Sequence, residues 1–275
     1  MNEKANKIAA LANTVVYDSK MVKSYVHRSP HIKHVSLRMF YAKLVTEVYN
    51  YALKYSDIIR VLDLGAGQGF STLPFLELGA RVTAIDSSSS QLEMLRHKCK
   101  RFNNRLELRC EDVSETLKMK EQRYDVIVAT SFLHHIPDYL GMIKESISLL
   151  TTHGQFFSFE DPLRYASIDA VAKFFSNISY FSWRIFEGDV WGGTKRRIRR
   201  SRGIYLADSV HDNVEYHVTR NGVDQDAILA LFNQADFESK FIRYFSTQSR
   251  LFQPIGAAMG IKNTFLIIAR KRSNG

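Results

Sequence analysis

Residues 58–70 read IIRVLDLGAGQGF, an apolar run that ends in three glycines at every second position. A short β-rich run followed by a glycine-rich turn and a helical pattern predicts a strand–turn–helix unit whose helix N–H groups face a ligand. Glycine suits this turn because the backbone must bend tightly and approach the ligand closely. Such turns bind phosphates and dinucleotides as well as other ligands, so the turn alone does not identify the ligand. The spacing is GxGxG, however, and the dinucleotide form places its third glycine one residue later.

Working outward from this turn, short β-rich runs alternate with helical patterns. This alternation predicts an α/β fold with a parallel sheet and right-handed crossovers. Upstream, apolar residues at helical spacing from Leu37 to Tyr55 predict an amphipathic helix. Downstream, a helix is expected from Ser88, another between Leu140 and Leu150 that Gly154 ends, and a third at 224–237. The five alternating strands and the two closing strands are expected at 58–64, 81–86, 105–110, 124–130, 155–160, 237–246 and 263–272.

Acidic residues follow the second and third of these strands. Asp86 ends the second strand, 21 residues after Gly65, where a carboxylate can accept hydrogen bonds from ribose hydroxyls. Asp112 follows the third strand, where an acidic side chain can receive the exocyclic amine of a base. Each carboxylate taken alone is equally well explained as a helix cap or turn residue. The three loops together favour a nucleoside-containing ligand.

The segments VLDLGAGQGF, VTAID, CEDV, YDVIVATSFLHHIPD and GQFFSFE, in this order and spacing, resemble the successive motifs of class I S-adenosylmethionine-dependent methyltransferases, in particular the group that acts on small molecules. The resemblance covers about 57–160 and, more loosely, 224–271. It implies a Rossmann-like, mostly parallel seven-stranded sheet with helices on both faces and an antiparallel last strand, and it implies S-adenosylmethionine as the cofactor. In the family pattern the three glycines line the methionine end, Asp86 holds the ribose, and Asp112 with Val113 holds the adenine edge. The full set of expected cofactor-binding residues is Asp63, Gly65, Ala66, Gly67, Gly69, Asp86, Ser87, Asp112, Val113 and Thr130.

The chain is therefore expected to have three parts. Residues 1–56 would form an N-terminal helical cap or lid, and 57–161 with 224–275 the cofactor-binding domain. Residues 162–223 are aromatic, basic and irregular, and we interpret them as an insertion after strand five that binds the methyl acceptor. In the resembling family, acceptor sites lie in such added segments.

Methyl transfer to a hydroxyl needs a group that takes the proton of the acceptor within hydrogen-bond reach. His134 and His135 follow the fourth strand, at the sheet edge where ligands of such folds bind, and an imidazole titrates near neutrality. Adjacent side chains point in different directions, so at most one of the two histidines is expected to act directly. His135 is the first candidate, and Asp161, at the end of strand five, is an alternative. Packing over the cofactor, or a turn before a proline, would explain the same residues without catalysis.

Composition bears on the acceptor and the compartment. Net charge is +10, and the run KRRIRRSR at 195–202 supplies six of these charges, which leaves +4 for the remainder. Such a cluster attracts anions, so an anionic or sugar-like small molecule is expected, although a solvated loop explains the run equally well. The run also fits an alternative, an RNA methyltransferase, and a second alternative is a non-catalytic binding protein that keeps the cofactor fold. The expected acceptor-binding residues are Tyr17, Arg196, Arg197 and Arg200.

The remaining expectations are negative or general. Cys99 and Cys110 have no metal-ligand spacing around them, so we expect no metal site and free thiols in a reducing compartment. No apolar run approaches the roughly 20 residues of a membrane span, and the N-terminus lacks the features of a secretory signal. A cytoplasmic location is therefore expected. The oligomeric state cannot be predicted from these features.

Overall fold

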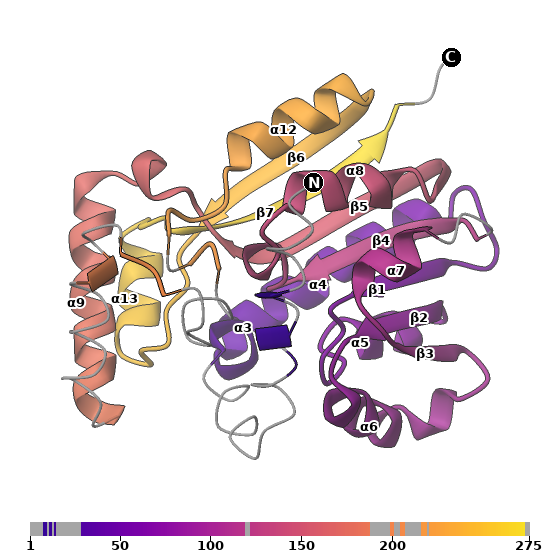
Figure 1. The fold of residues 1–275 in the computed structure, drawn as a ribbon, viewed down its shortest axis with the longest axis horizontal. Coiled ribbons are helices and arrows are strands. Elements are labelled where there is room, and N and C mark those ends of the chain that lie inside the picture. The colour runs from indigo at the N-terminus through magenta and orange to yellow at the C-terminus, as the bar shows by residue number, and fades with distance from the viewer. Residues whose placement is uncertain are drawn as a thin grey trace.

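A seven-stranded sheet runs through the centre of the molecule (Figure 1). Structure is described for 29–118, 122–187 and 220–272, and for residues 8, 9, 11, 12, 14, 199, 200, 204–206 and 216–218 in this computed structural model. Within these residues the strand order is β3-β2-β1-β4-β5-β7-β6, with β1 to β5 parallel and β7 antiparallel to both of its neighbours. This is the topology that the motifs implied. The strands are β1 (Arg60–Leu64), β2 (Arg81–Asp86), β3 (Leu106–Cys110), β4 (Tyr124–Thr130), β5 (Leu150–Pro162), β6 (Phe237–Tyr244) and β7 (Thr264–Lys271).

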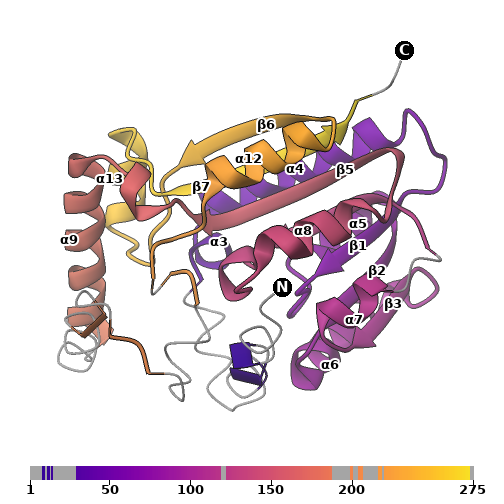
Figure 2. The same cartoon turned by 45° about the horizontal axis from the view of Figure 1, so that its top comes forward.

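Helices cover both faces of this sheet, as Figures 1 and 2 show together. Apolar residues of α4, α5 and α6 pack on one face, and those of α7, α8 and α12 pack on the other. Each face is apolar because a strand between two helical layers is buried on both sides. The described helices are α3 (Pro30–Lys33), α4 (Val35–Ala52), α5 (Thr72–Leu78), α6 (Ser89–Lys98), α7 (Val113–Lys118), α8 (Tyr139–Ile147), α9 (Ala170–Glu187), α12 (Gln225–Gln234) and α13 (Phe252–Ala258), with short 3₁₀ turns η1 (Lys100–Phe102), η2 (Leu133–His135) and η3 (Tyr165–Ser167).

The helix predicted upstream of the glycine turn is α4, and it belongs to the core of the sheet domain. Tyr41, Val45 and Val48 are almost fully buried against β4 and β5 residues such as Val126 and Phe157. Gln155 Nε2, in β5, also donates a hydrogen bond to the backbone oxygen of Val48 at 2.6 Å. The boundary expected at residue 56 therefore does not separate a cap from the sheet in this part of the chain.

The structure corrects three local predictions. Gly154 does not end the helix before strand five: α8 stops at Ile147, and Gly154 lies inside the long strand β5. The strand expected at 237–246 stops at Tyr244, and helix α13, which was not expected, lies in its connection to β7. The segment after strand five is not irregular throughout, since it contains the 18-residue helix α9.

Helix α9 packs beside α13 at one end of the sheet (Figures 1 and 2). Phe175 makes edge-on ring contacts with Phe245 and Phe252, and Ala172 is fully buried. The opposite side of α9 is also apolar, with Phe174 67% exposed. Its apolar residues, such as Val171, Phe174, Ile178 and Phe181, recur at helical spacing, so the sequence contains a helix pattern that the interpretation of this segment as irregular overlooked.

Two sequence expectations concern features that the fold describes directly. Cys99 is buried, Cys110 is exposed, and both are free thiols. Among the described residues no helix is long and apolar enough to cross a membrane.

Candidate functional site

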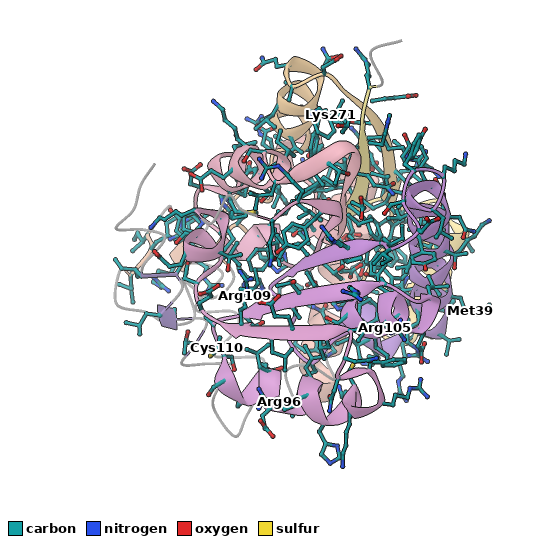
Figure 3. The ribbon with its side chains drawn as sticks, turned by 90° about the vertical axis from the view of Figure 1, so that its right-hand side faces the viewer. Met39, Arg96, Arg105, Arg109, Cys110 and Lys271 are labelled. Carbon is teal, nitrogen blue, oxygen red and sulfur yellow. The ribbon has the colours of Figure 1, made fainter. Side chains whose placement is uncertain are left out.

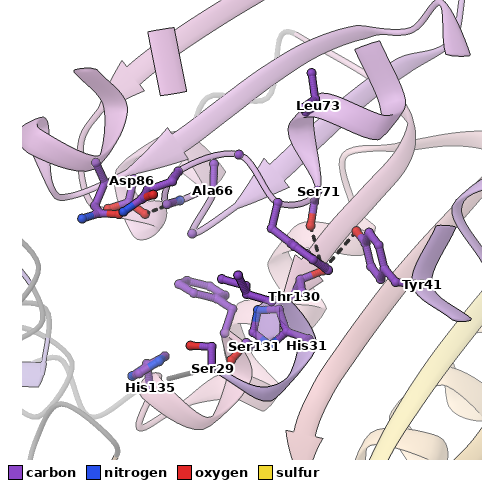
Figure 4. Close-up of a pocket in the computed structure, with 18 of the residues that line it drawn as sticks. Ser29, His31, Tyr41, Ala66, Ser71, Leu73, Asp86, Thr130, Ser131 and His135 are labelled. Carbon is purple, nitrogen blue, oxygen red and sulfur yellow. Dashed lines mark hydrogen bonds between the residues drawn. The ribbon is translucent and has the colours of Figure 1, made fainter. Parts of the chain in front are cut away.

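A cavity of about 470 Å³ lies at the carboxyl edge of the parallel strands (Figure 4). This size is within the range of small-molecule and cofactor pockets. The glycine turn after β1, the ends of β2 and β4, and the start of the α3–α4 segment form its walls. The sequence-predicted residues that line it are Gly65, Ala66, Gly67, Gly69, Asp86, Ser87, Asp112, Val113, Thr130 and His135.

The glycine turn has the left-handed backbone that its sequence predicts. Gly65, Gly67 and Gly69 have φ values of 68°, 50° and 85°. Gly67 lines the cavity, and a Cβ atom at this position would meet no atom within 4 Å. At Gly69, in contrast, a Cβ would lie 2.3 Å from Leu95 Cδ1. Gly67 therefore leaves room for a ligand, whereas Gly69 leaves room for packing of α6.

Asp86 joins the second strand to this turn. Its Oδ2 accepts a hydrogen bond from the Gly67 N–H at 2.8 Å (Figure 4). Its Oδ1 accepts one from the Ser88 N–H at 2.8 Å. A carboxylate oxygen can accept more than one hydrogen bond, so a residue that fixes this turn can also bind a ligand. Asp112 Oδ1 accepts from the Ser114 N–H at 2.8 Å at the start of α7. Both carboxylates thus bind backbone N–H groups of their own turns, as helix-cap or turn residues do, and both also line the cavity.

Asp63 is the one expected cofactor residue that does not line the cavity. It is buried in β1, and Thr72 Oγ1 donates a hydrogen bond to its Oδ2 at 2.6 Å. Burial raises the pKa of this carboxyl from 3.8 to about 7, mainly through loss of hydration. The hydrogen bond between Asp63 and Thr72 fixes the start of α5 against β1, and these two elements flank the glycine turn.

Three hydroxyl groups meet at the end of β4. Ser71 Oγ donates to Thr130 Oγ1 at 2.8 Å, and Thr130 Oγ1 donates to Tyr41 Oη at 3.3 Å (Figure 4). Tyr41 comes from α4, and burial raises the pKa of its phenol well above the usual range, so this phenol is neutral. The apolar spacing of α4 placed Tyr41 on the buried face, but it gave no sign that its hydroxyl reaches the cavity.

The two adjacent histidines after β4 have different environments. The 3₁₀ turn η2 has three residues per turn, so successive side chains point about 120° apart. His135 lines the cavity, whereas His134 Nδ1 lies 2.8 Å from Asp161 Oδ1. The His134 backbone N–H also donates to Asp161 Oδ1 at 3.1 Å. The two imidazole rings remain close, with centroids 4.2 Å apart.

Asp161 is fully buried and does not line the cavity. Loss of hydration raises its pKa to about 7, while bonding to the His134 backbone and the charge of His135 oppose this shift. The residue before it, Glu160, has a left-handed φ of 67°, and the pairing of β5 with β7 shifts register between Phe159 and Asp161. This bulge turns Asp161 toward η2. Asp161 is placed to orient the histidine loop, not to contact a ligand in the cavity.

The segment before α4 supplies a wall that the sequence predicted only as a lid surface. His31 is 5% exposed, lines the cavity and contacts Phe70 edge-on, with ring centroids 4.7 Å apart. Burial lowers its pKa to about 3, so its imidazole is neutral, and its Nδ1 has no hydrogen-bond partner among the described residues. Arg38 also lines the cavity, and its Nη1 donates to the Ile32 backbone oxygen at 2.6 Å. Farther upstream, Thr14 Oγ1 donates to Ser87 Oγ at 3.1 Å.

The expected acceptor-binding residues cannot be placed at this cavity. Tyr17, Arg196 and Arg197 lie outside the described residues. Arg200 is described and half-buried, but it does not line the cavity. Among the described residues, no group of histidine, cysteine and acidic side chains has the arrangement of a metal site.

Comparison with known proteins identifies the class of this fold. Residues 61–154 match the family model described as "Methyltransferase domain". Ubiquinone biosynthesis O-methyltransferase of Coxiella burnetii is 32% identical over 98 residues, which are 36% of this chain and 42% of the relative. The corresponding enzyme of Pelagibacter ubique is 32% identical over 99 residues, which are 36% and 40%. The matched region thus spans less than half the length of these curated relatives.

Solved structures resemble the chain over nearly its whole length. The plantazolicin methyltransferase BpumL, in complex with a triazolic desmethylPZN analogue and SAH, has a TM-score of 0.56 at 15% identity and covers 98% of both chains. Magnesium protoporphyrin IX methyltransferase from Synechocystis, with bound SAM, has a TM-score of 0.53 at 13% identity and covers 96% of this chain and 97% of its own. These likenesses concern the fold. The fold of class I S-adenosylmethionine-dependent methyltransferases, expected from the motifs, is confirmed.

Proposed function

We propose that this protein is an S-adenosylmethionine-dependent methyltransferase that methylates a hydroxyl group of a small molecule. The observation that carries the proposal is a single cavity in which the open space over Gly67 and the Asp86 carboxylate lie together with His135. The first two suit the cofactor and the third suits the acceptor. The match of residues 61–154 to a methyltransferase domain and the names of the curated relatives support the same reaction.

The residues of the glycine edge fit the cofactor. Gly65, Gly67 and Gly69 would surround its methionine end, where backbone N–H groups and the lack of side chains allow close contact. Asp86, which lines the cavity, would accept hydrogen bonds from the ribose hydroxyls, since each carboxylate oxygen can accept more than one hydrogen bond. Asp112 and Val113 would contact the adenine edge. Bound there, the sulfonium group of the cofactor supplies a methyl group for an in-line displacement.

The chain's own contribution to this displacement is mainly positioning. Aligning the acceptor oxygen with the breaking bond accounts for much of the rate acceleration in such reactions. Thr130 holds the end of β4 in place through Ser71 and Tyr41, and all three residues line the cavity. His135 would accept the proton of the acceptor hydroxyl as its oxygen attacks.

Asp161 and His134 act in this proposal as positioning residues. Asp161 binds both the ring and the backbone N–H of His134, so it fixes the short turn that carries His135. Neither Asp161 nor His134 lines the cavity, so neither is assigned a contact with substrate.

The walls around His135 suggest the character of the acceptor. Phe70, Phe132 and Ile136 form apolar surfaces suited to a flat or apolar body. The neutral imidazole of His31 would bind a second hydroxyl, as on a sugar-like or catechol-like molecule. Arg38 would hold an anionic group, in place of the arginines of the basic run that the sequence suggested. The insertion at 162–223 remains a proposed part of the acceptor site.

Transfer of a radiolabelled methyl group from S-adenosylmethionine to a panel of hydroxylated aromatic acids, sugars and RNA tests this function. We expect transfer to small hydroxylated acceptors that His135→Ala reduces at least a hundredfold and that the matched variant His153→Ala leaves within twofold. His153 lies away from the cavity, stacked on Tyr55 with ring centroids 4.0 Å apart. Transfer only to RNA, or equal effects of both substitutions, would contradict the proposal.

A further inference from the structure

A second cavity lies at the opposite edge of the sheet, where the parallel strands begin. Its volume is about 410 Å³, and four arginines line it, each at or just before the start of a strand: Arg60, Arg81, Arg105 and Arg123. Strand β1 has five residues, so this edge is roughly 17 Å from the glycine turn at about 3.3 Å per residue. Figure 3 shows Arg105 at one end of β3 and Cys110 at the other.

The sheet register brings these cations together. Arg60 and Arg81 are directly paired across β1 and β2, and the Val82 N–H donates to the Arg105 backbone oxygen at 2.8 Å. Neighbouring strands in a sheet are about 4.8 Å apart, and like charges directly opposite each other are unfavourable. Within the described part of the chain, no carboxylate forms an ion pair with Arg60, Arg81 or Arg105.

The carboxylates of Asp125 and Glu107 lie at this edge of the sheet, but both are bound to other groups. Asp125 Oδ2 accepts a hydrogen bond from the Arg60 backbone N–H at 2.9 Å, not from its guanidinium. Glu107 is the acidic residue in the lining of the cavity, but its Oε1 is paired with Arg109 Nε at 2.7 Å and its Oε2 accepts from Thr83 Oγ1 at 3.1 Å. Arg105 uses Nη1 to donate to the backbone oxygen of Leu76 at 2.9 Å, which caps the end of α5. The remaining polar lining includes Asn104 and Gln122, and Gln122 Oε1 accepts a hydrogen bond from Tyr124 Oη at 2.7 Å.

We propose that this arginine cavity binds a small molecule carrying two or more linked phosphate groups. Arginine presents a planar fork of N–H donors that binds phosphate oxygens in pairs, and several such forks around one cavity favour a multiply charged oxyanion. Bound there, the ligand would offset the repulsion between Arg60 and Arg81. The cavity volume of about 410 Å³ is sufficient for a compact diphosphate, and the RNA arm of the test below distinguishes this ligand from an extended nucleic-acid backbone. This site is separate from the methyl-transfer cavity and does not depend on the proposed function.

Calorimetric titration with inorganic pyrophosphate, at low and high salt, tests this inference. We expect binding of one pyrophosphate per chain that weakens with salt and is at least tenfold weaker in the double variant Arg60→Gln/Arg81→Gln. The matched double variant Arg96→Gln/Arg101→Gln removes the same two charges from exposed ion pairs with Glu93 and Glu77, and it should bind within twofold of the native protein. Asp86→Ala should leave pyrophosphate binding unchanged, so failure of the cofactor assignment would not affect this result.

Three results would overturn the inference. The first is no detectable pyrophosphate binding by the folded native protein. The second is an equal loss in both double variants, which would indicate a response to net charge alone. The third is binding of RNA oligonucleotides that is tighter than pyrophosphate binding, increases with length and is lost in Arg60→Gln/Arg81→Gln, which would assign the surface to a nucleic-acid backbone. Thermal unfolding of each variant establishes that it is folded.

Discussion

Alanine substitution at two glycines of the same turn should distinguish the glycine that leaves room for a ligand from the glycine that leaves room for a packed side chain. Both Gly67 and Gly69 have left-handed φ values, so either alanine costs about 1–2 kcal/mol of folding stability through the backbone. For Gly67→Ala this is the whole structural cost, because the new Cβ meets no atom within 4 Å. For Gly69→Ala the Cβ falls 2.3 Å from Cδ1 of Leu95, which is fully buried, and overpacking adds about 1–3 kcal/mol.

The effect on cofactor affinity should not follow this order of stability. Gly67→Ala should lower the melting temperature by only about 2–8 °C. It should nevertheless weaken binding of S-adenosylhomocysteine at least tenfold, because the methyl group of the new alanine enters the cavity beside Asp86. Gly69→Ala should lower the melting temperature more and affect binding less. Differential scanning calorimetry and isothermal titration measure the two quantities on the same samples. Native affinity in Gly67→Ala, together with a tenfold loss in Gly69→Ala, would refute the assignment of the open space to the cofactor.

The remaining predictions concern the histidine turn and the buried carboxylates. His135→Ala should reduce kcat by about 10²–10⁴-fold with unchanged affinity for S-adenosylhomocysteine, measured by steady-state kinetics and titration; a change in affinity alone would argue against a role in proton transfer. Asp161→Asn should reduce kcat by about tenfold to a hundredfold through misplacement of the His135 turn, again without loss of cofactor affinity, and a fully active variant would remove Asp161 from the mechanism. The pKa of Asp63 is about 7 in the folded protein against an ordinary 3.8, so between these pH values the folded protein keeps a proton that the unfolded chain releases. The stability that Asp63 contributes through this proton is therefore fully present below about pH 4 and is lost as the pH rises toward 7. Denaturant unfolding of Asp63→Asn should therefore show a shallower loss of stability between pH 4 and pH 8, by up to about 4 kcal/mol, and an unchanged slope would contradict the assigned pKa.

The sheet and the cofactor edge could be predicted because both depend on local patterns. Apolar runs between turn residues located β1 to β4, and their alternation with helices implied parallel order. Once the strands are parallel, their carboxyl ends must meet at one edge, so the glycines, Asp86, Asp112 and Thr130 were expected in one place. All of them line the same cavity.

The acceptor side depended on contacts between distant segments, which one sequence does not reveal. The HH pair gave no indication that His134 would contact Asp161, 27 residues away, because that contact requires the bulge at Glu160. Tyr41 and His31 reach the cavity from two helices, α4 and α3, that precede the glycine motif. The basic run drew attention because of its charge, but the arginines gathered by the sheet register are dispersed in sequence and produced no local signal.

Calorimetric titration of S-adenosylhomocysteine into the native protein and Asp86→Ala tests most directly whether the carboxyl edge of this sheet binds the cofactor. One binding event per chain is expected for the native protein. Loss of hydrogen bonds to a charged acceptor, worth about 1.5–3 kcal/mol each, should weaken binding by roughly tenfold to more than a hundredfold in Asp86→Ala. Asp125→Ala, which removes a strand carboxylate at the opposite edge, should bind like the native protein. No heat of binding with folded native protein, or equal affinity in Asp86→Ala, would contradict the account.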